Sequence, residues 1–375
     1  ATPTRTPTPT PTARPTVTPT AAPAPTSSSS NGSTGSGNFR PAFSMSARDV
    51  ADTSGHAEVM LTNLLLAIVL MLLVLFDASI INSTVEENHD FFEPWIDRFT
   101  GPARGLFHQL GFVVHRATGN WTFERLSRYM GLLGLTSLVY AMLDPNFGFN
   151  QTTFVLMLSL IIGIGAMTVT FDGVQIWLAR RRYGLAAGIL FFPFAIILAI
   201  GSVLLSRLFD VHPGIIYGFV AAAAFMPGEE PSTGEEGKLI YLPMLVMFGF
   251  SLLSWLLVSP FRSWAEDGSF FGALLEAVAV AIFVGGIQGL LFTLVPIEFM
   301  DGQKVWKWSR LAWFSIALPV TFVFLHVLMN PQGDFSSPIQ DTSLKALFIL
   351  CVAIWLATGA IWLYFRQRKA RMEAA

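Results

Sequence analysis

The chain is poor in charged residues and has almost no cysteine. Only 13% of its 375 residues are Asp, Glu, Lys or Arg, and Cys351 is its single cysteine. One cysteine excludes an intramolecular disulfide framework and a cysteine-based metal site. Because Cys351 lies within an apolar run, we expect it to be a small buried residue rather than a reactive thiol.

The sequence also lacks the local motifs of common hydrolases and nucleotide-driven proteins. It contains neither the G-x-S-x-G sequence of serine hydrolases nor the G-x-x-x-x-G-K-S/T loop that binds phosphate. We therefore expect a protein that is not an enzyme, that uses no cofactor or metal and that has no nucleic-acid partner.

Hydrophobic residues, by contrast, make up 53% of the chain, with 33 Phe and 10 Trp. This composition is far from the soluble average and predicts a polytopic membrane protein surrounded by the lipid bilayer. Because helices satisfy their own backbone groups in lipid, the predicted fold is an all-α transmembrane helix bundle. Judged against the roughly 20 residues that cross a bilayer, about nine apolar runs are candidate spans: 59–76, 129–143, 153–177, 185–205, 215–226, 239–258, 273–296, 312–329 and 347–365.

Residues 1–55 have a different composition. Thr alternates with Pro at first, and Ser, Gly and Asn then take over. Such a segment has too few large apolar groups to offset the entropy of folding, so we predict a disordered, partly polyproline-like stalk outside the cytoplasm. Since the chain begins with neither Met nor a signal peptide, we expect it to be the C-terminal part of a longer protein with an exported module upstream. The alternative is a terminal tail without a role.

The distribution of Lys and Arg orients the predicted bundle, because these residues are retained on the cytoplasmic side of short loops. An extracytoplasmic N-terminus and nine crossings leave only Arg207, Arg262 and Lys345 in the short outside loops. The run 215–226 is short and follows Asp210, His212 and Pro213. If it merely re-entered the membrane, the later basic clusters would move outside, so we predict that it crosses and that the C-terminus is cytoplasmic in a multi-pass protein of the cell membrane.

These runs divide the chain into the stalk, a first anchor at 56–78, a segment at 79–128, a multi-span bundle at 129–366 and a basic cytoplasmic tail at 367–375. Ser83 and Thr84 stand three residues before Glu86 and Glu87, which is the spacing of a capping box. With the Phe and Trp residues that follow, this spacing predicts two amphipathic helices on the cytoplasmic leaflet within 79–128. They are a candidate docking surface for a cytoplasmic protein partner; packing under the bundle is the alternative.

Two Asp-Gly sequences follow long apolar runs and share the pattern D-G-x-x-(I/V)-W-x-x-x-R. The first contains Asp172, Gly173, Trp177 and Arg181, and the second contains Asp301, Gly302, Trp306 and Arg310. Both are predicted to enter the cytoplasm, which favours a parallel internal repeat over an inverted one, with coincidence as the alternative.

Each Asp-Gly pair has two interpretations. The Asp carboxylate is expected to cap an interfacial helix, with Trp at its preferred interfacial depth and Arg reaching the headgroups. The alternative is that Asp172 and Asp301 form a paired-carboxylate site for a cation or proton near the membrane surface.

The run 273–296 carries two polar residues, Glu276 and Gln288. A carboxyl group inside a span is costly unless it is paired or hydrated. Gly285 and Gly289 permit close helix approach, and Gln288 can form hydrogen bonds across that contact. Tight packing is the first interpretation; a polar pathway through Glu276 and Gln288, with His212 or His326 near the outer surface, is the second.

The residues that follow carry a resemblance to a known family. Phe292-Thr293-Leu294-Val295-Pro296, with Asp301-Gly302 and Trp306 behind it, resembles the signature of the FGLLP motif-containing membrane proteins, an uncharacterised group of bacterial polytopic proteins. Phe292, Leu294 and Pro296 keep the letters of that motif, and Thr293 and Val295 depart from it. The resemblance covers about 59–365 and implies a bacterial membrane protein without implying a reaction.

The segment from Pro296 to Gly302 is also similar to the Pro-rich, Asp-Gly segment in which intramembrane site-2-type metalloproteases hold their third zinc ligand. Those enzymes also require H-E-x-x-H. His108 and His115 are seven residues apart and lack the Glu, so zinc proteolysis is not predicted and Asp301 is not assigned as a ligand.

Two functions of different classes remain. The first is a non-enzymatic membrane anchor or scaffold that tethers an exported module and recruits a cytoplasmic partner. The second is a transporter or channel that uses Glu276 and Gln288. A hydrated cavity reaching Glu276 would favour transport, and a Glu276 enclosed by neighbouring side chains would favour the anchor.

Overall fold

The computed structural model describes residues 39–48, 50–51, 53–88, 91, 123–191, 194–209, 211, 214–218, 221–225, 231–298, 300–329 and 342–373. The predicted stalk up to residue 38 therefore lies outside the described residues. Residues 92–122, which are most of the segment predicted to form two amphipathic helices, lie outside them as well. So do His108, His115, Asp210, His212 and Pro213.

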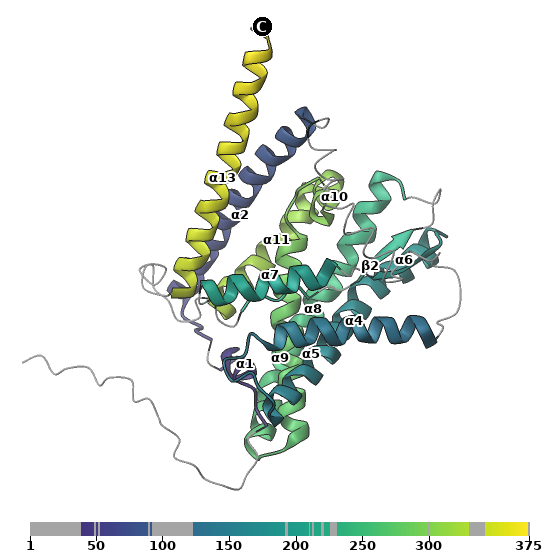
Figure 1. Ribbon diagram of the computed structural model, residues 1–375, viewed down its shortest axis with the longest axis vertical. Coiled ribbons are helices and arrows are strands. Elements are labelled where there is room, and N and C mark those ends of the chain that lie inside the picture. Colours follow the sequence, from purple (N-terminus) through teal and green to yellow (C-terminus); the bar gives the residue numbers. More distant parts are fainter. Residues whose placement is uncertain are drawn as a thin grey trace, which may run out of the picture. The chain divides into compact units, whose positions relative to one another are not determined.

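Helices dominate the described part of the chain (Figure 1). A short helix, α1 (Ala42–Ser46), precedes the long α2 (Ala57–Glu87). The remaining helices are α4 (Phe123–Ala141), α5 (Gln151–Thr168), α6 (Val174–Arg182), α7 (Phe194–Leu208), α8 (Thr233–Glu266), α9 (Phe270–Thr293), α10 (Asp301–Trp308), α11 (Arg310–Val323) and α13 (Thr342–Glu373). Two π-helical turns, η1 (Val169–Gly173) and η2 (Phe324–Met329), continue α5 and α11.

Among the described residues, five helical stretches are long and apolar enough to cross a membrane: Ala57–Glu87, Gln151–Arg182, Gly234–Glu266, Phe270–Thr293 and Arg310–Met329. Tyr129–Ala141 and Ala195–Leu208 are apolar but shorter. The chain thus has the helices of a membrane-embedded protein, as its composition predicts.

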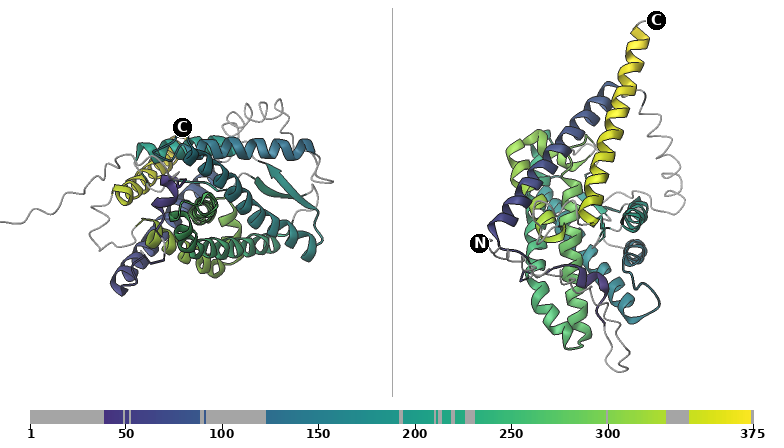
Figure 2. Two further views of the ribbon diagram at one scale, coloured as in Figure 1. Left: turned by 90° about the horizontal axis from the view of Figure 1, so that it is seen from below. Right: turned by 90° about the vertical axis from the view of Figure 1, so that its left-hand side faces the viewer.

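The centre of the bundle is α9. Of its most apolar window, 72% is buried inside the protein, against 22% for α2, so α2 leaves most of its surface uncovered by the rest of the protein. Small residues allow this enclosure: a Cβ on Gly286 would lie 2.1 Å from Ser251 Oγ on α8. On another side of α9, a Cβ on Gly163 of α5 would lie 3.0 Å from the Cβ of Ala281. At the edge of the bundle, α2 and α13 run side by side (Figures 1 and 2).

The prediction of full helical spans at 185–205 and 215–226 is wrong. Strand β1 (Ala187–Phe191) pairs antiparallel with β2 (Ala221–Phe225), and residues 214–218 before β2 are not helical. Between the strands, α7 has 15 residues. A short apolar run is compatible with a strand or a helix, because its periodicity does not separate the two. Backbone groups of β1 and β2 satisfy one another, and the fold therefore contains a small sheet in addition to helices.

The pairing of β1 with β2 brings two distant parts of the chain together. Ala187 lies opposite Phe225, so after α7 the chain returns to the place that it left before α7.

The predicted capping box at Ser83 and Thr84 is also wrong. Both residues lie inside α2, which continues to Glu87, and both hydroxyl groups donate to the carbonyl oxygen of Ile80, at 3.0 and 2.7 Å. Ser and Thr satisfy their hydroxyls in this way within helices. The first span therefore extends eleven residues beyond the predicted end at 76 and includes Asp77.

Candidate functional site

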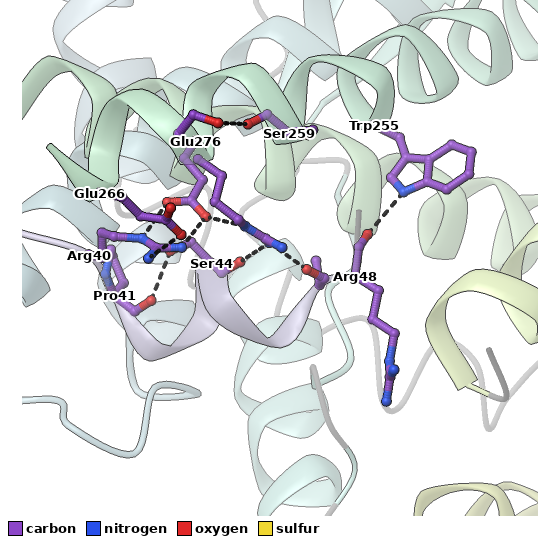
Figure 3. A network of polar contacts seen from close by, with 11 residues as sticks. Arg40, Pro41, Ser44, Arg48, Trp255, Ser259, Glu266 and Glu276 are labelled. Carbon is purple, nitrogen blue, oxygen red and sulfur yellow. Dashed lines mark hydrogen bonds and ion pairs between the residues drawn. The ribbon is translucent and has the colours of Figure 1, made fainter. Parts of the chain in front are cut away.

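Glu276 lies in the second turn of α9 and is fully buried, with 0% of its surface exposed. Two arginines from other segments hold it (Figure 3). Arg40 donates through Nε to Oε2 and through Nη2 to Oε1, each at 2.8 Å. Arg262, near the end of α8, donates from Nε to Oε1 at 2.9 Å. We call these three residues the Glu276 clamp.

The clamp attaches the segment before the first span to the bundle. Arg262 Nη2 donates to the carbonyl of Ala47 at 2.7 Å, just beyond the last residue of α1. At the other end of this short helix, the Phe43 N–H donates to Asp144 Oδ2 at 3.0 Å. The indole N–H of Trp255 donates to the Arg48 carbonyl at 3.0 Å (Figure 3). Residues 40–48 are thus bonded to α8, to α9 and to the turn after α4.

The clamp is an ion-pair cluster with little access to water. Both arginine side chains are 15% exposed, and Glu266 adds a weaker contact of 3.5 Å from its 60% exposed carboxylate. The hydrogen bonds to Glu276 raise the pKa of Arg40 above its ordinary value, against the opposing effect of burial. Bidentate pairing supplies the geometry that makes a buried carboxylate tolerable, and removing one partner leaves an uncompensated buried charge.

Gln288, three turns further along α9, forms hydrogen bonds with the backbone of the non-helical segment 214–218. Its Oε1 accepts the Ile216 N–H at 2.6 Å and its Nε2 donates to the Gly214 carbonyl at 2.9 Å. Two more side chains support the same non-helical segment. Ser206 Oγ accepts the Ile215 N–H at 2.8 Å, and the Tyr140 hydroxyl lies 3.0 Å from both the N–H and the carbonyl of Tyr217. These side chains replace the hydrogen bonds that a helix would have provided.

Glu276 and Gln288 form hydrogen bonds with different parts of the chain. Twelve residues separate them on α9, about 18 Å at 1.5 Å per residue. His326 is 6% exposed and its Nδ1 accepts from the Asn63 amide at 2.9 Å. Each of these three polar side chains thus has a partner within the protein.

The corner after α9 is held by side-chain amides and main-chain groups. Asn82 of α2 donates to the Pro296 carbonyl and accepts the Glu298 N–H, both at 2.9 Å. The Trp313 indole N–H donates to the Leu294 carbonyl at 2.8 Å. We call residues 294–308 the inner corner.

The predicted capping role of Asp301 is wrong. The N-cap of α10 is Met300, a residue without a capping oxygen, and Asp301 begins the helix. Its carboxylate pairs with Lys304 at 3.2 Å, and Lys304 also pairs with Glu236 of α8 at 2.9 Å. Only glycine fits at position 302 without a shift of the backbone, since a Cβ there would lie 2.4 Å from the Leu294 carbonyl oxygen. Burial lowers the pKa of Lys304, but Asp301 and Glu236 outweigh it and raise the pKa overall.

Aromatic and cationic groups pack against one another at the inner corner. Trp306 packs edge to face against Trp313, with ring centroids 5.2 Å apart. The Arg310 guanidinium lies 5.4 Å from the centroid of the Trp306 ring. Phe292 is 40% exposed and lies edge to face with Tyr217 at 6.2 Å.

The other Asp-Gly pair has a different local structure. Asp172 and Gly173 lie in η1, inside a helical stretch that is continuous from Gln151 to Arg182, whereas Asp301 begins a new helix after a turn. Trp177 is 60% exposed. Corresponding residues thus occupy different structures, and the two sequences do not form a local structural repeat.

The structure nevertheless brings the two aspartates within electrostatic reach of each other. Asp172 is 1% exposed, accepts a hydrogen bond from the backbone of Ala223 in β2, and is subject to the negative charge of Asp301. Its Oδ2 has no hydrogen-bond partner among the described residues. Those residues contain no group of three or more His, Cys, Asp or Glu side chains that could hold a metal ion.

Sequence reasoning missed the partners of these residues. Arg40 was assigned to the stalk and Arg262 to an outside loop, and Asn82 appeared to lie beyond the first span. For Glu276 a signal was present, because a buried acid requires a cationic partner and few basic residues lie on the predicted outer side. Asp77, whose Oδ1 lacks a partner in the described structure, was missed because the predicted span ended one residue earlier.

No protein-family model, curated protein or solved structure significantly matches this chain.

Proposed function

We propose that this protein is a non-enzymatic membrane anchor or scaffold that holds the segment preceding its first span in a fixed position. The observation that carries the proposal is the Glu276 clamp. The Glu276 carboxylate has 0% exposure and accepts hydrogen bonds from two arginines on both of its oxygens. Such an ion-pair cluster is suited to holding elements together. One of those arginines, Arg40, comes from the chain that leads out of residues 1–38, so the clamp is also the point at which an exported module would be attached.

The proposed orientation places the clamp outside the cell and the inner corner in the cytoplasm. The clamp joins α1 to the α8–α9 turn, while Asn82 joins the far end of α2 to the end of α9. Opposite ends of α2 and α9 therefore carry the two sets of contacts. Lys304 and Lys307 lie at the inner corner and Arg310 follows it at the start of α11, which supports a cytoplasmic location for the corner.

The experiment is affinity purification of the full chain from crosslinked cells, with Arg40→Ala as the variant and Arg48→Ala as its matched control. Arg48 contributes its carbonyl to Trp255, and that contact does not require its side chain. We expect a cell-surface protein to be recovered with the wild type and Arg48→Ala, and to be reduced with Arg40→Ala. The absence of any stoichiometric partner from the wild type would contradict the scaffold.

Asp172 favours a second proposal, transport of a proton or small cation. A carboxylate that is 1% exposed, has one oxygen without a described partner and faces a second acid is costly unless it has a role. Purified protein in sealed liposomes should then carry a flux that Asp172→Asn abolishes. Equal flux in empty liposomes and in liposomes with the wild type would exclude transport of the species tested.

A further inference from the structure

A cavity of about 230 Å³ lies between α2, α7, α9, α11 and α13. Its walls are almost entirely hydrocarbon and aromatic, with side chains such as Met71, Phe292 and Ala317. The lining residues with polar side-chain groups are Gln288, Thr321 and Trp313, together with the weakly polar thiol of Cys351. We call this cavity the apolar groove.

Water is a poor occupant of the apolar groove. The Gln288 amide already bonds to Ile216 and Gly214, and the Trp313 indole N–H already bonds to Leu294. These bonds leave the Thr321 hydroxyl as the principal polar side-chain group among the described lining residues. A buried water requires two to four polar partners, so an apolar cavity of this kind stays dry or holds an apolar guest.

The apolar groove extends along α11 and η2. Along α11 and η2 it is lined by Trp313, Ala317, Thr321, Phe324 and Met329. The spacing of the first three, four residues each time, places them on one face of the helix. From Trp313 to Met329 the rise is about 24 Å at 1.5 Å per residue, most of the thickness of a bilayer core. An elongated guest fits this shape better than a compact one.

The apolar groove also reaches the surface that faces lipid. Three of its lining residues are substantially exposed: Leu205 on α7 at 39%, Phe292 on α9 at 40% and Ile354 on α13 at 45%. Phe292 belongs to a helix that is long and apolar enough to cross a membrane, where the neighbouring solvent is the acyl region of the bilayer. The groove is thus open to hydrocarbon chains.

We propose that the apolar groove binds an acyl chain of a bilayer lipid. The chain lies along α11, with α2 and α13 on one side and α9 on the other. It supplies packing contacts that the side chains alone leave unmade, and so links the α2–α13 pair to the centre of the bundle. This proposal is independent of the anchor function.

The test uses the full-length protein in bilayers that contain a phosphatidylcholine with a photoreactive diazirine on one acyl chain. After illumination, the protein is extracted, and adducts are mapped by mass spectrometry. We expect adducts on Met71, Trp313 and Cys351 in addition to those on lipid-exposed residues such as Leu72. When the protein is first washed free of bulk lipid in detergent and then illuminated, adducts in the apolar groove should persist and those on Leu72 should disappear.

Two variants fill the apolar groove from opposite walls, Ala317→Phe on α11 and Met71→Trp on α2. The matched control is Ala357→Phe, at an exposed position of α13 outside the groove. We expect a several-fold loss of the Cys351 adduct in both filling variants and no loss in the control. Size-exclusion profiles and circular dichroism identify a variant that fails to fold, in which case the other one decides.

Unchanged labelling of Cys351 in a folded filling variant would overturn the proposal. Absence of adducts at all three groove positions in the wild type would do the same. A peptide-to-peptide crosslink at these positions would show that a second copy or another segment of this chain occupies the groove, and would also overturn it.

Discussion

The two ends of the bundle are held by different chemistry. At the clamp, a fully buried carboxylate is shared by two arginines that are each 15% exposed. At the inner corner, neutral amide and indole groups bond to main-chain atoms, and the ion pairs lie at the surface: Lys307 and Glu298 are 46% and 55% exposed. Where water is excluded, stability depends on the balance of charges, and where water is available it depends on how closely the chain packs. Removing a charged group should therefore destabilise the clamp, and adding a side-chain atom should destabilise the inner corner.

Replacing Glu276 by Ala should have the largest effect. It leaves Arg40 and Arg262 close together with only the exposed Glu266 as a counter-charge, and breaking a buried pair in this way costs about 3–5 kcal/mol. The free energy of unfolding, measured by denaturation with SDS in mixed micelles, should fall by that amount. The control is Glu266→Ala, because its carboxylate is 60% exposed. An exposed pair contributes at most about 1 kcal/mol, so equal effects of the two variants would remove the contrast between buried and exposed charge.

Gly302→Ala tests the role of space at the inner corner. The new Cβ would lie 2.4 Å from the Leu294 carbonyl oxygen, so the corner must shift. Overpacking of this kind costs about 1–3 kcal/mol. Gly234→Ala is the control, since no described atom lies within 4 Å of the Cβ it would add. Unfolding in the same micelles should show a loss for the first variant and little change for the second.

Asn82→Ala should have an intermediate effect. It removes the donor to Pro296 and the acceptor of Glu298, and hydrogen bonds contribute about 0.5–1.5 kcal/mol each. Hydrogen exchange at the amides of residues 297–300 reports the loss directly, because this segment should open more often in the variant. Exchange that matches the wild type would mean that Asn82 does not hold the corner.

The smallest expected effect is the pH dependence of the Glu298–Lys307 pair. The hydrogen bond from Lys307 lowers the pKa of Glu298. A carboxyl group whose pKa is lower in the folded state stabilises the fold above its unfolded pKa, and this contribution disappears as the pH falls through the folded value. At 55% exposure the contribution is at most about 1 kcal/mol. Lys307→Met should therefore destabilise the protein slightly near pH 7 and much less at acidic pH, where Glu298 is protonated in both proteins.

Composition was sufficient for the class of protein, a helical chain with apolar helices long enough to cross a membrane. The sequence was insufficient where a short apolar run can form either a strand or a helix, as at 215–226. Glu276 and Gln288 were identified as important polar residues, but their partners lie up to 236 positions away in the sequence. Spacing along the chain contains no information on such contacts, which arise only when helices pack. The interpretation of Asp301 as a cap was wrong because the turn places Met300 at that position.

The pairing of Ala187 with Phe225 makes the intervening residues a closed loop that returns to its starting point. Lengthening or shortening α7 would leave the entry and exit of this loop in place, because the β1–β2 pairing fixes both. The residues between Ala187 and Phe225 are thus a part of the protein in which insertions and deletions should be tolerated without displacing α6 or α8.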